Sequence, residues 1–293
     1  MVLNLVGCTN AINKEDNSTT NQDNQNKIVE ETSPDISYMG MRLKDESVSM
    51  KSSSIFNIQT DEQFAPSLEI KNGFDSNQKY RVIFLIDYKP ITFLVDGREH
   101  TYFDFNIDAD AIEKIDIIFP KLVDGQHDLT TVIIREPEQI FKEPIFVPGF
   151  EHILAHRSNI IVSTDKINPP EFIQVDAHST IANYGEKVIL NQGSLIDLDN
   201  PISLLHKSNL NNIWISFENE SDSSKYAVII LDIIQIKSDV EFVSTDTKGI
   251  IKRSMDLPDE FKSTTNLVVL AVENPFTTNN KRPYLSNKIS LVN

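Results

Sequence analysis

The pair of residues best spaced for metal chemistry is His152 and His156, separated by three residues. On a helix this spacing places both imidazoles on one face, where they can hold zinc. The first histidine lacks the following glutamate of zinc proteases, and the surrounding residues favour loop and strand. Along a strand, side chains four residues apart lie about 13 Å from each other. We therefore expect no metal site here.

Clustered acids are the second candidate for chemistry. One cluster contains Asp108, Asp110 and Glu113, and another contains Asp197 and Asp199. Carboxylate oxygens are the ligands that calcium prefers. Neither cluster has the spacing of an EF-hand loop, so we interpret both as solvated acids in turns. The sequence predicts no bound metal and no cofactor.

Patterns for a nucleophile or a phosphate site are absent from the sequence. There is no G-x-S-x-G motif and no glycine-rich phosphate loop, and the chain has only nine glycines. The single cysteine, Cys8, excludes an internal disulfide and a thiolate metal cluster. We therefore predict no catalytic residues and a protein that is not an enzyme.

The cysteine lies in a recognisable context. Leu5-Val6-Gly7-Cys8 resembles the bacterial lipobox, in which the cysteine becomes the diacylated first residue of the mature protein. The resemblance implies a signal peptide and a lipid anchor on Cys8 at the extracytoplasmic face of the bacterial cell membrane. Seven residues before Cys8 are fewer than a signal peptide has; a native start upstream of Met1 would explain the difference. The alternative is an apolar N-terminus with an incidental cysteine.

Composition divides the rest of the chain. Residues 9–34 are too poor in apolar side chains to offset the entropy of ordering, which predicts a disordered spacer. Residues 38–51 have neither a helical nor a strand period, so they are either a lead-in to the first domain or more linker. We assign 1–53 to the lipobox remnant and spacer, 54–168 to a first domain and 169–293 to a second, with Asn168-Pro169-Pro170 at the boundary.

The two domains share a repeated stretch. Residues 72–87 and 219–232 each begin with an asparagine, continue with Asp-Ser and Lys-Tyr, and lead into a β-branched apolar run. This pattern predicts a polar loop that leads into a buried strand. The tyrosines Tyr80 and Tyr226 are expected to pack while their hydroxyls bond a neighbouring loop. We infer a diverged duplication.

Strand signals recur every 8 to 15 residues in the first domain, and helical periodicity is nearly absent. Asp96-Gly97 between apolar runs predicts a hairpin. Asp124-Gly125-Gln126-His127 before an apolar strand resembles a turn of bacterial immunoglobulin-like domains. We predict an all-β protein, with two tandem antiparallel immunoglobulin-like β-sandwiches preceded by a disordered N-terminal tether. Trp214, between two isoleucines, is expected in the core.

The expected function is binding rather than catalysis. A net charge of −16 repels phosphate backbones, so we expect no nucleic-acid partner. The partner would be a cell-envelope protein or a wall polymer. One alternative is a carbohydrate-binding or adhesive module, which would expose the aromatic residues Tyr88, Tyr102, Phe103 and Trp214. Another is a cell-wall hydrolase, in which a carboxylate pair from Asp104, Asp108 or Glu113 would converge across a cleft.

Overall fold

The structure is a computed structural model that describes residues 38–45, 55–142, 152–164, 166, 168–178, 188–192, 202–207, 213–255, 257, 259–278 and 281–292. Strands dominate these residues, with one short 3-10 helix, η2 (Asp259–Ser263), before a late strand. The prediction of an all-β protein is confirmed. Cys8 and the acids Asp197 and Asp199 lie outside the described residues.

The first sandwich consists of two facing sheets. The outer sheet has the order β1 (Met39–Lys44), β3 (Ser67–Asn72), β9 (Ile112–Asp116). The inner sheet has the order β2 (Ile55–Ile58), β11 (Ile153–Val162), β10 (Gly125–Arg135), β4 (Gln78–Ile86), β5 (Lys89–Pro90), with β8 (Phe103–Ile107) also paired to β4. Pairing is antiparallel except that β2 runs parallel to β11.

The second sandwich repeats this arrangement. Its outer sheet runs β14 (Val188–Gln192), β16 (Ile213–Asn219), β19 (Gly249–Met255), with β13 (Ala177–His178) on the far side of β19. Its inner sheet runs β15 (Leu204–His206), β22 (Ile289–Val292), β20 (Asn266–Glu273), β17 (Ser224–Asp232), β18 (Lys237–Thr245), with β12 (Ile173–Gln174) beside β18 and β21 (Tyr284–Leu285) beside β20.

Seven strands of each sandwich follow the same order. β1-β3-β9 matches β14-β16-β19, and β2-β11-β10-β4 matches β15-β22-β20-β17. Even the exceptional parallel pair recurs, because β15 runs parallel to β22 as β2 does to β11. This is an immunoglobulin-like arrangement of two antiparallel sheets. The common topology supports the duplication that the repeated stretch indicates.

The first strand lies in the stretch assigned to the spacer. Met39–Lys44 forms β1 and pairs with β3 from Met39 opposite Asn72 to Lys44 opposite Ser67. Met39, Met41 and Leu43 point inward, and the residues between them point outward. These residues thus belong to the first sandwich, as the lead-in alternative expects, although the assignment of 1–53 placed them with the spacer. Their short alternation is diluted in a window of 14 residues (38–51).

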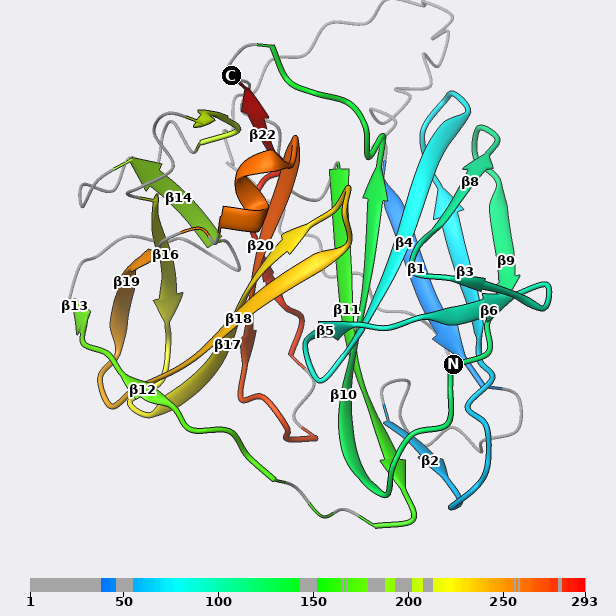
Figure 1. Ribbon diagram of the computed structural model, residues 1–293, viewed down its shortest axis with the longest axis horizontal. Coiled ribbons are helices and arrows are strands. Elements are labelled where there is room, and N and C mark those ends of the chain that lie inside the picture. Colours follow the sequence, from blue (N-terminus) through cyan, green and yellow to red (C-terminus); the bar gives the residue numbers. More distant parts are fainter. Residues whose placement is uncertain are drawn as a thin grey trace, which may run out of the picture. The chain divides into compact units, whose positions relative to one another are not determined.

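Each sandwich has its own core, and a third apolar layer joins the two. The inner sheets pack face to face, so that Ile83, Leu85, Val132 and Ile134 of the first meet Ile229, Leu231, Val268 and Leu270 of the second. Figure 1 shows β4, β10 and β11 beside β17 and β20. Strands with both faces covered are apolar at every position. This explains the apolar runs at residues 82–86 and 227–231.

The repeated stretch locks the loop before each of these central strands. The hydroxyl of Tyr80 donates to Oδ1 of the buried Asn72 at 2.9 Å, and that of Tyr226 donates to Asn219 at 3.0 Å. Nδ2 of Asn72 donates in turn to the carbonyls of Ser76, Ile107 and Asp108. The expectation that the tyrosine hydroxyls bond a neighbouring loop is confirmed. The repeat therefore has a structural role, because it holds the loop before the central strand of each sandwich.

Candidate functional site

A completely buried polar cluster joins the two sandwiches. The side chains of Asp128 and Arg157, on β10 and β11, are both completely buried. Nη2 of Arg157 lies 3.0 and 2.9 Å from the two carboxylate oxygens of Asp128, and the guanidinium also donates to the carbonyls of Glu273, Asn274 and Thr277. An ion pair of the first sandwich thus binds the backbone of the second.

Tyr88 completes this cluster from a tight turn. Asp87 and Tyr88 have φ values of 50° and 70°, and they join β4 to β5 as a two-residue hairpin loop. The turn directs the ring of Tyr88 into the layer between the sandwiches, where its hydroxyl donates to Asp128. Burial raises the pKa of Tyr88 well above its usual value. Burial also raises the pKa of Asp128, although Arg157 opposes that shift.

A second cationic cluster holds the other end of the interface. Arg81 forms a two-pronged ion pair with Asp104, with both N–O distances 2.7 Å, and donates to the carbonyl of Ile233 across the interface. Lys288 of the second sandwich donates to the carbonyl of Glu136 in the first. Burial lowers the pKa of Lys288 to about 8. These contacts fix the relative position of the two sandwiches.

The turn before β10 is held by His127. Its two ring nitrogens lie 2.8 Å from a carboxylate oxygen of Asp87 and 2.9 Å from the carbonyl oxygen of Val123. Because both neighbours are acceptors, the ring satisfies both contacts only when it carries two protons. The hydrogen bond to Asp87 accordingly raises the pKa of His127. The histidine of the D-G-x-H turn therefore has a structural role.

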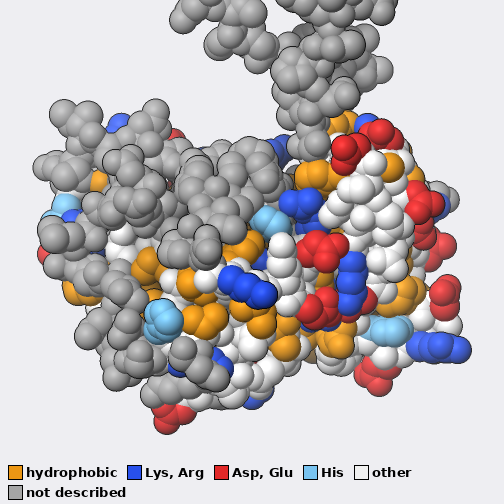
Figure 2. All heavy atoms as spheres, turned by 90° about the horizontal axis from the view of Figure 1, so that it is seen from above, with side chains coloured by type: hydrophobic (Ala, Val, Ile, Leu, Met, Phe, Trp, Pro, Cys, Tyr) orange, Lys and Arg blue, Asp and Glu red, His pale blue; other side chains and the backbone are white. Residues whose placement is uncertain are grey.

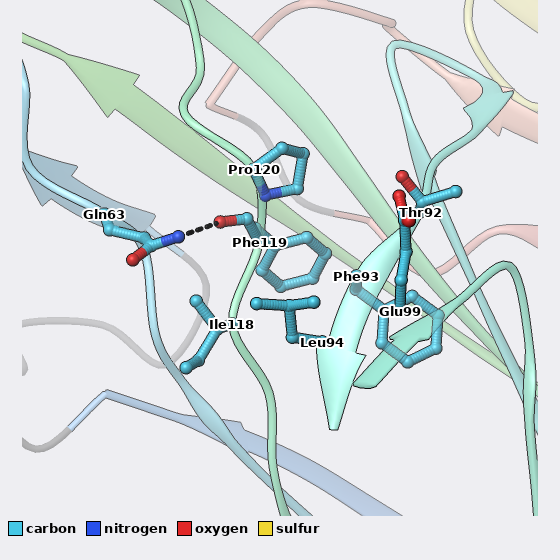
Figure 3. Close-up of a pocket in the computed structure, with 8 residues that line it drawn as sticks. All are labelled: Gln63, Thr92, Phe93, Leu94, Glu99, Ile118, Phe119 and Pro120. Atoms are coloured by element: carbon cyan, nitrogen blue, oxygen red, sulfur yellow. Dashed lines mark hydrogen bonds between the residues drawn. The ribbon is translucent and has the colours of Figure 1, made fainter. Parts of the chain in front are cut away.

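A pocket lies under the predicted Asp-Gly hairpin, which the structure confirms as β6 (Phe93–Val95) paired with β7 (Arg98–His100). Its cavity volume is about 170 Å³. Phe93, Leu94, Ile118, Phe119 and Pro120 form its apolar walls, and Gln63, Thr92 and Glu99 supply the polar side chains. Figure 3 shows Gln63 at one end, donating to the carbonyl of Phe119 at 3.1 Å, and Thr92 with Glu99 at the other.

The floor of this pocket is rigid. Leu94 and Ile118 exchange two backbone hydrogen bonds of 2.8 and 3.0 Å. The rings of Phe93 and Phe119 are buried and pack edge-on against Phe84 of the central strand, with centroid distances of 4.8 and 5.0 Å. The pocket is thus built on the core of the first sandwich rather than on a loop alone.

His152 and His156, whose spacing suggested metal chemistry, are not part of the polar clusters or the pocket described above. His152 is buried, and burial lowers its pKa to about 4. His156 lies on β11, and burial lowers its pKa as well. Within the described ranges no three His, Cys, Asp or Glu side chains are grouped to hold a metal.

The carboxylates of the hydrolase alternative are dispersed. Asp104 lies on β8 and is held by Arg81, whereas Asp108 follows β8 and accepts from Asn77 at 2.8 Å. Glu113 is exposed on β9, in the other sheet of the sandwich. Their surroundings give no support to an acid pair across a cleft.

The four candidate aromatic residues do not share a platform. Tyr88 is buried, Phe103 is half-buried against the first core, and only Tyr102 of the four is exposed. The guanidinium of Arg81 covers the Tyr102 ring at 4.1 Å from its centroid. The core assignment of Trp214 is wrong, because Ile213, Ile215 and Phe217 fill the core and alternation turns Trp214 to the outer face.

Two further observations concern surface charge and helix length. On the right-hand half of the face in Figure 2, acidic and basic side chains are interspersed. None of the helices in the described part of the chain has the length and apolarity needed to cross a bilayer.

Comparison with known proteins gives distant likenesses. No family model and no curated protein matches the chain. Among solved structures, the CARDB domain of a Pyrococcus furiosus protein in complex with di-metal ions aligns at 7% identity and TM-score 0.30, covering 45% of this chain and 99% of that one. The Caenorhabditis elegans MSP family member WR4 aligns at 14% and 0.23, covering 37% and 91%. The PapD-like domain 7 of human CEP192 aligns at 12% and 0.25, covering 50% and 100%. At these values none of the three carries a functional inference.

Proposed function

We propose that this chain is a non-catalytic binding protein, lipid-anchored through Cys8 at the extracytoplasmic face of the bacterial cell membrane, that holds a cell-envelope protein through its first sandwich. The lipobox-like Leu5-Val6-Gly7-Cys8 and the single cysteine support the anchor. The shared apolar layer and the Arg157–Asp128 pair support a stiff body that presents its surfaces in a fixed geometry.

The pocket under the β6–β7 hairpin carries the binding part of the proposal. Its volume of about 170 Å³ lies below the roughly 300–1,000 Å³ of typical small-molecule sites. It matches one large apolar side chain, which is how a protein partner anchors in a pocket at an interface. Gln63 and Glu99 are placed to bond polar groups next to such a side chain. This favours a protein over a wall polymer as the partner.

Site-specific photocrosslinking in cells tests both the envelope-protein partner and the pocket as its binding surface. A photoreactive amino acid is placed at position 99, at the pocket, and in a control strain at position 248, which is exposed on the second sandwich. We expect a crosslinked envelope protein from position 99 alone, and its loss when Leu94→Trp fills the pocket. Equal products from both positions would contradict the binding surface.

The anchor is tested by fractionating cells that express the gene with its native upstream codons. We expect the wild type in the membrane fraction and Cys8→Ser in the soluble fraction. If both variants are cytosolic, the lipobox resemblance is accidental and the envelope partner falls with it.

A further inference from the structure

The outer face of the β1–β3–β9 sheet has a composition unlike that of the chain as a whole. Strand alternation and pairing register define this face by its outward residues: Tyr38, Gly40, Arg42, Lys44, Ser67, Glu69, Lys71, Ile112, Lys114 and Asp116. We call this set the β1 face. Four of its side chains are cations and two are acids, a net charge of 4 − 2 = +2. The chain carries −16, so the remainder carries −16 − 2 = −18.

The cations surround a single acid at the centre of the face. Register places Arg42 and Lys114 on either side of Glu69, and Lys44 donates to its carboxylate. The hydrogen bond from Lys44, followed by the charges of Lys44, Arg42 and Lys114, lowers the pKa of Glu69. Three cations thus converge on one carboxylate at the centre of the face.

Apolar and aromatic side chains accompany these cations. Tyr38 and Ile112 are 46% and 64% exposed, two of the few large hydrophobic side chains that are exposed in the described residues. The Tyr38 ring lies against two glycines: a Cβ on Gly73 would be 3.0 Å from the ring and 2.6 Å from the Tyr38 carbonyl oxygen, and one on Gly40 would be 3.9 Å from the ring. Lys71 donates to the Tyr38 hydroxyl at 2.7 Å. The ring is therefore held in place on the face.

We propose that the β1 face docks on an anionic lipid surface. Lysine and arginine are attracted to anionic headgroups, and tyrosine is enriched at the membrane–water interface, where its ring lies at headgroup depth. An exposed isoleucine favours a membrane over a soluble polyanion, which would leave that side chain in water. The three-stranded sheet presents all these groups on one face.

The position of β1 in the chain supports this choice. Tyr38 follows Cys8 by 38 − 8 = 30 residues, so under the proposed function the sheet nearest the anchor in sequence is the one that carries the cations. The inference rests on the proposed anchorage for its biological setting. Anchoring would supply the high local concentration that a face of net charge +2 needs for stable contact, and docking would set the orientation of the pocket.

Vesicle flotation of the purified full chain carrying Cys8→Ser tests the inference without any lipid anchor. The vesicles contain phosphatidylcholine alone or equal parts of phosphatidylcholine and phosphatidylglycerol, at low ionic strength. We expect partitioning to the anionic vesicles only, and its loss at about 1 M salt, where the Debye length falls to about 3 Å. Removing both exposed cations with Arg42→Gln and Lys114→Gln is expected to weaken partitioning about 25-fold, or about fivefold per cation.

A matched control pair, Lys89→Gln and Lys248→Gln, removes the same charge from exposed positions elsewhere and is expected to leave partitioning unchanged. The inference is overturned if the chain fails to float, if it floats equally with neutral vesicles, or if the control pair weakens binding as much as the test pair. Release by a soluble glycerol-phosphate polymer without any dependence on phosphatidylglycerol would assign the face to a polyanion instead. Because Cys8 is absent throughout, these results are independent of the fractionation that tests the anchor.

Discussion

Replacing Arg157 with methionine should be among the most destabilising single changes in this protein. The guanidinium is completely buried and pairs with Asp128, which would lose its only buried cationic partner in the described contacts. Three carbonyl groups of the second sandwich would also lose a donor. Removing one member of a buried ion pair typically costs about 3–5 kcal/mol. In a chain of this size that corresponds to a fall in Tm of about 6–10 °C.

The loss should depend on pH in a direction that the structure fixes. Burial raises the folded-state pKa of Asp128, and Arg157 opposes the rise, so Arg157→Met should raise it further. A carboxyl group whose folded pKa exceeds its unfolded value of about 3.9 favours folding when it is protonated. The deficit of Arg157→Met should therefore shrink as the pH falls through the raised pKa towards about 4.

Urea unfolding of four proteins at several pH values measures these effects: wild type, Arg157→Met, Asp128→Asn and the double variant. The double variant retains no buried charge at this cluster, so it should be more stable than the sum of the single losses predicts. Arg253→Met serves as the surface control. Its partner Glu241 is 21% exposed and Arg253 itself 31% exposed, so we expect a loss of less than about 1 kcal/mol. A loss below about 1 kcal/mol for Arg157→Met, or a deficit that grows in acid, would refute the reasoning.

Four further changes test local features. Tyr80→Phe should cost about 0.5–1.5 kcal/mol in urea unfolding because it removes one hydrogen bond. Asn72→Ala should cost more because three carbonyls lose their donor. Equal losses would contradict the role of Asn72 in holding the loop. The pKa of His127 is raised mainly by Asp87. The contribution of His127 to stability should therefore be complete below about pH 6.5 and vanish as the pH rises through the raised pKa. His127→Gln should abolish that pH dependence in thermal melts. Gly97→Ala should cost about 1 kcal/mol, since φ is +73° and no atom lies within 4 Å of the added methyl, and a larger loss would indicate a steric clash instead.

Local patterns were sufficient for features that depend on neighbouring residues. The Asp96-Gly97 hairpin follows from two residues that accept positive φ, and the structure has 51° and 73° there. The Asn-to-Tyr spacing predicted a loop bonded by the tyrosine hydroxyl, because the loop and the strand are continuous in the chain. Alternation of apolar and polar residues predicted strands, except over residues 38–51, where the six alternating residues of β1 are flanked by residues without alternation.

Other features required the tertiary structure because their partners are distant in the chain. Arg157 binds carbonyls 116 to 120 residues away, and nothing in its own neighbourhood marks it as buried. Trp214 between two isoleucines has the pattern of a core residue, yet period-two alternation turns it outward once its neighbours fill the core. The cations of the β1 face come from three strands, and only sheet register brings them together. Sequence alone thus determined the class of fold and its repeated loop, whereas the contacts between sheets decided which polar and aromatic side chains are buried and which remain available for binding.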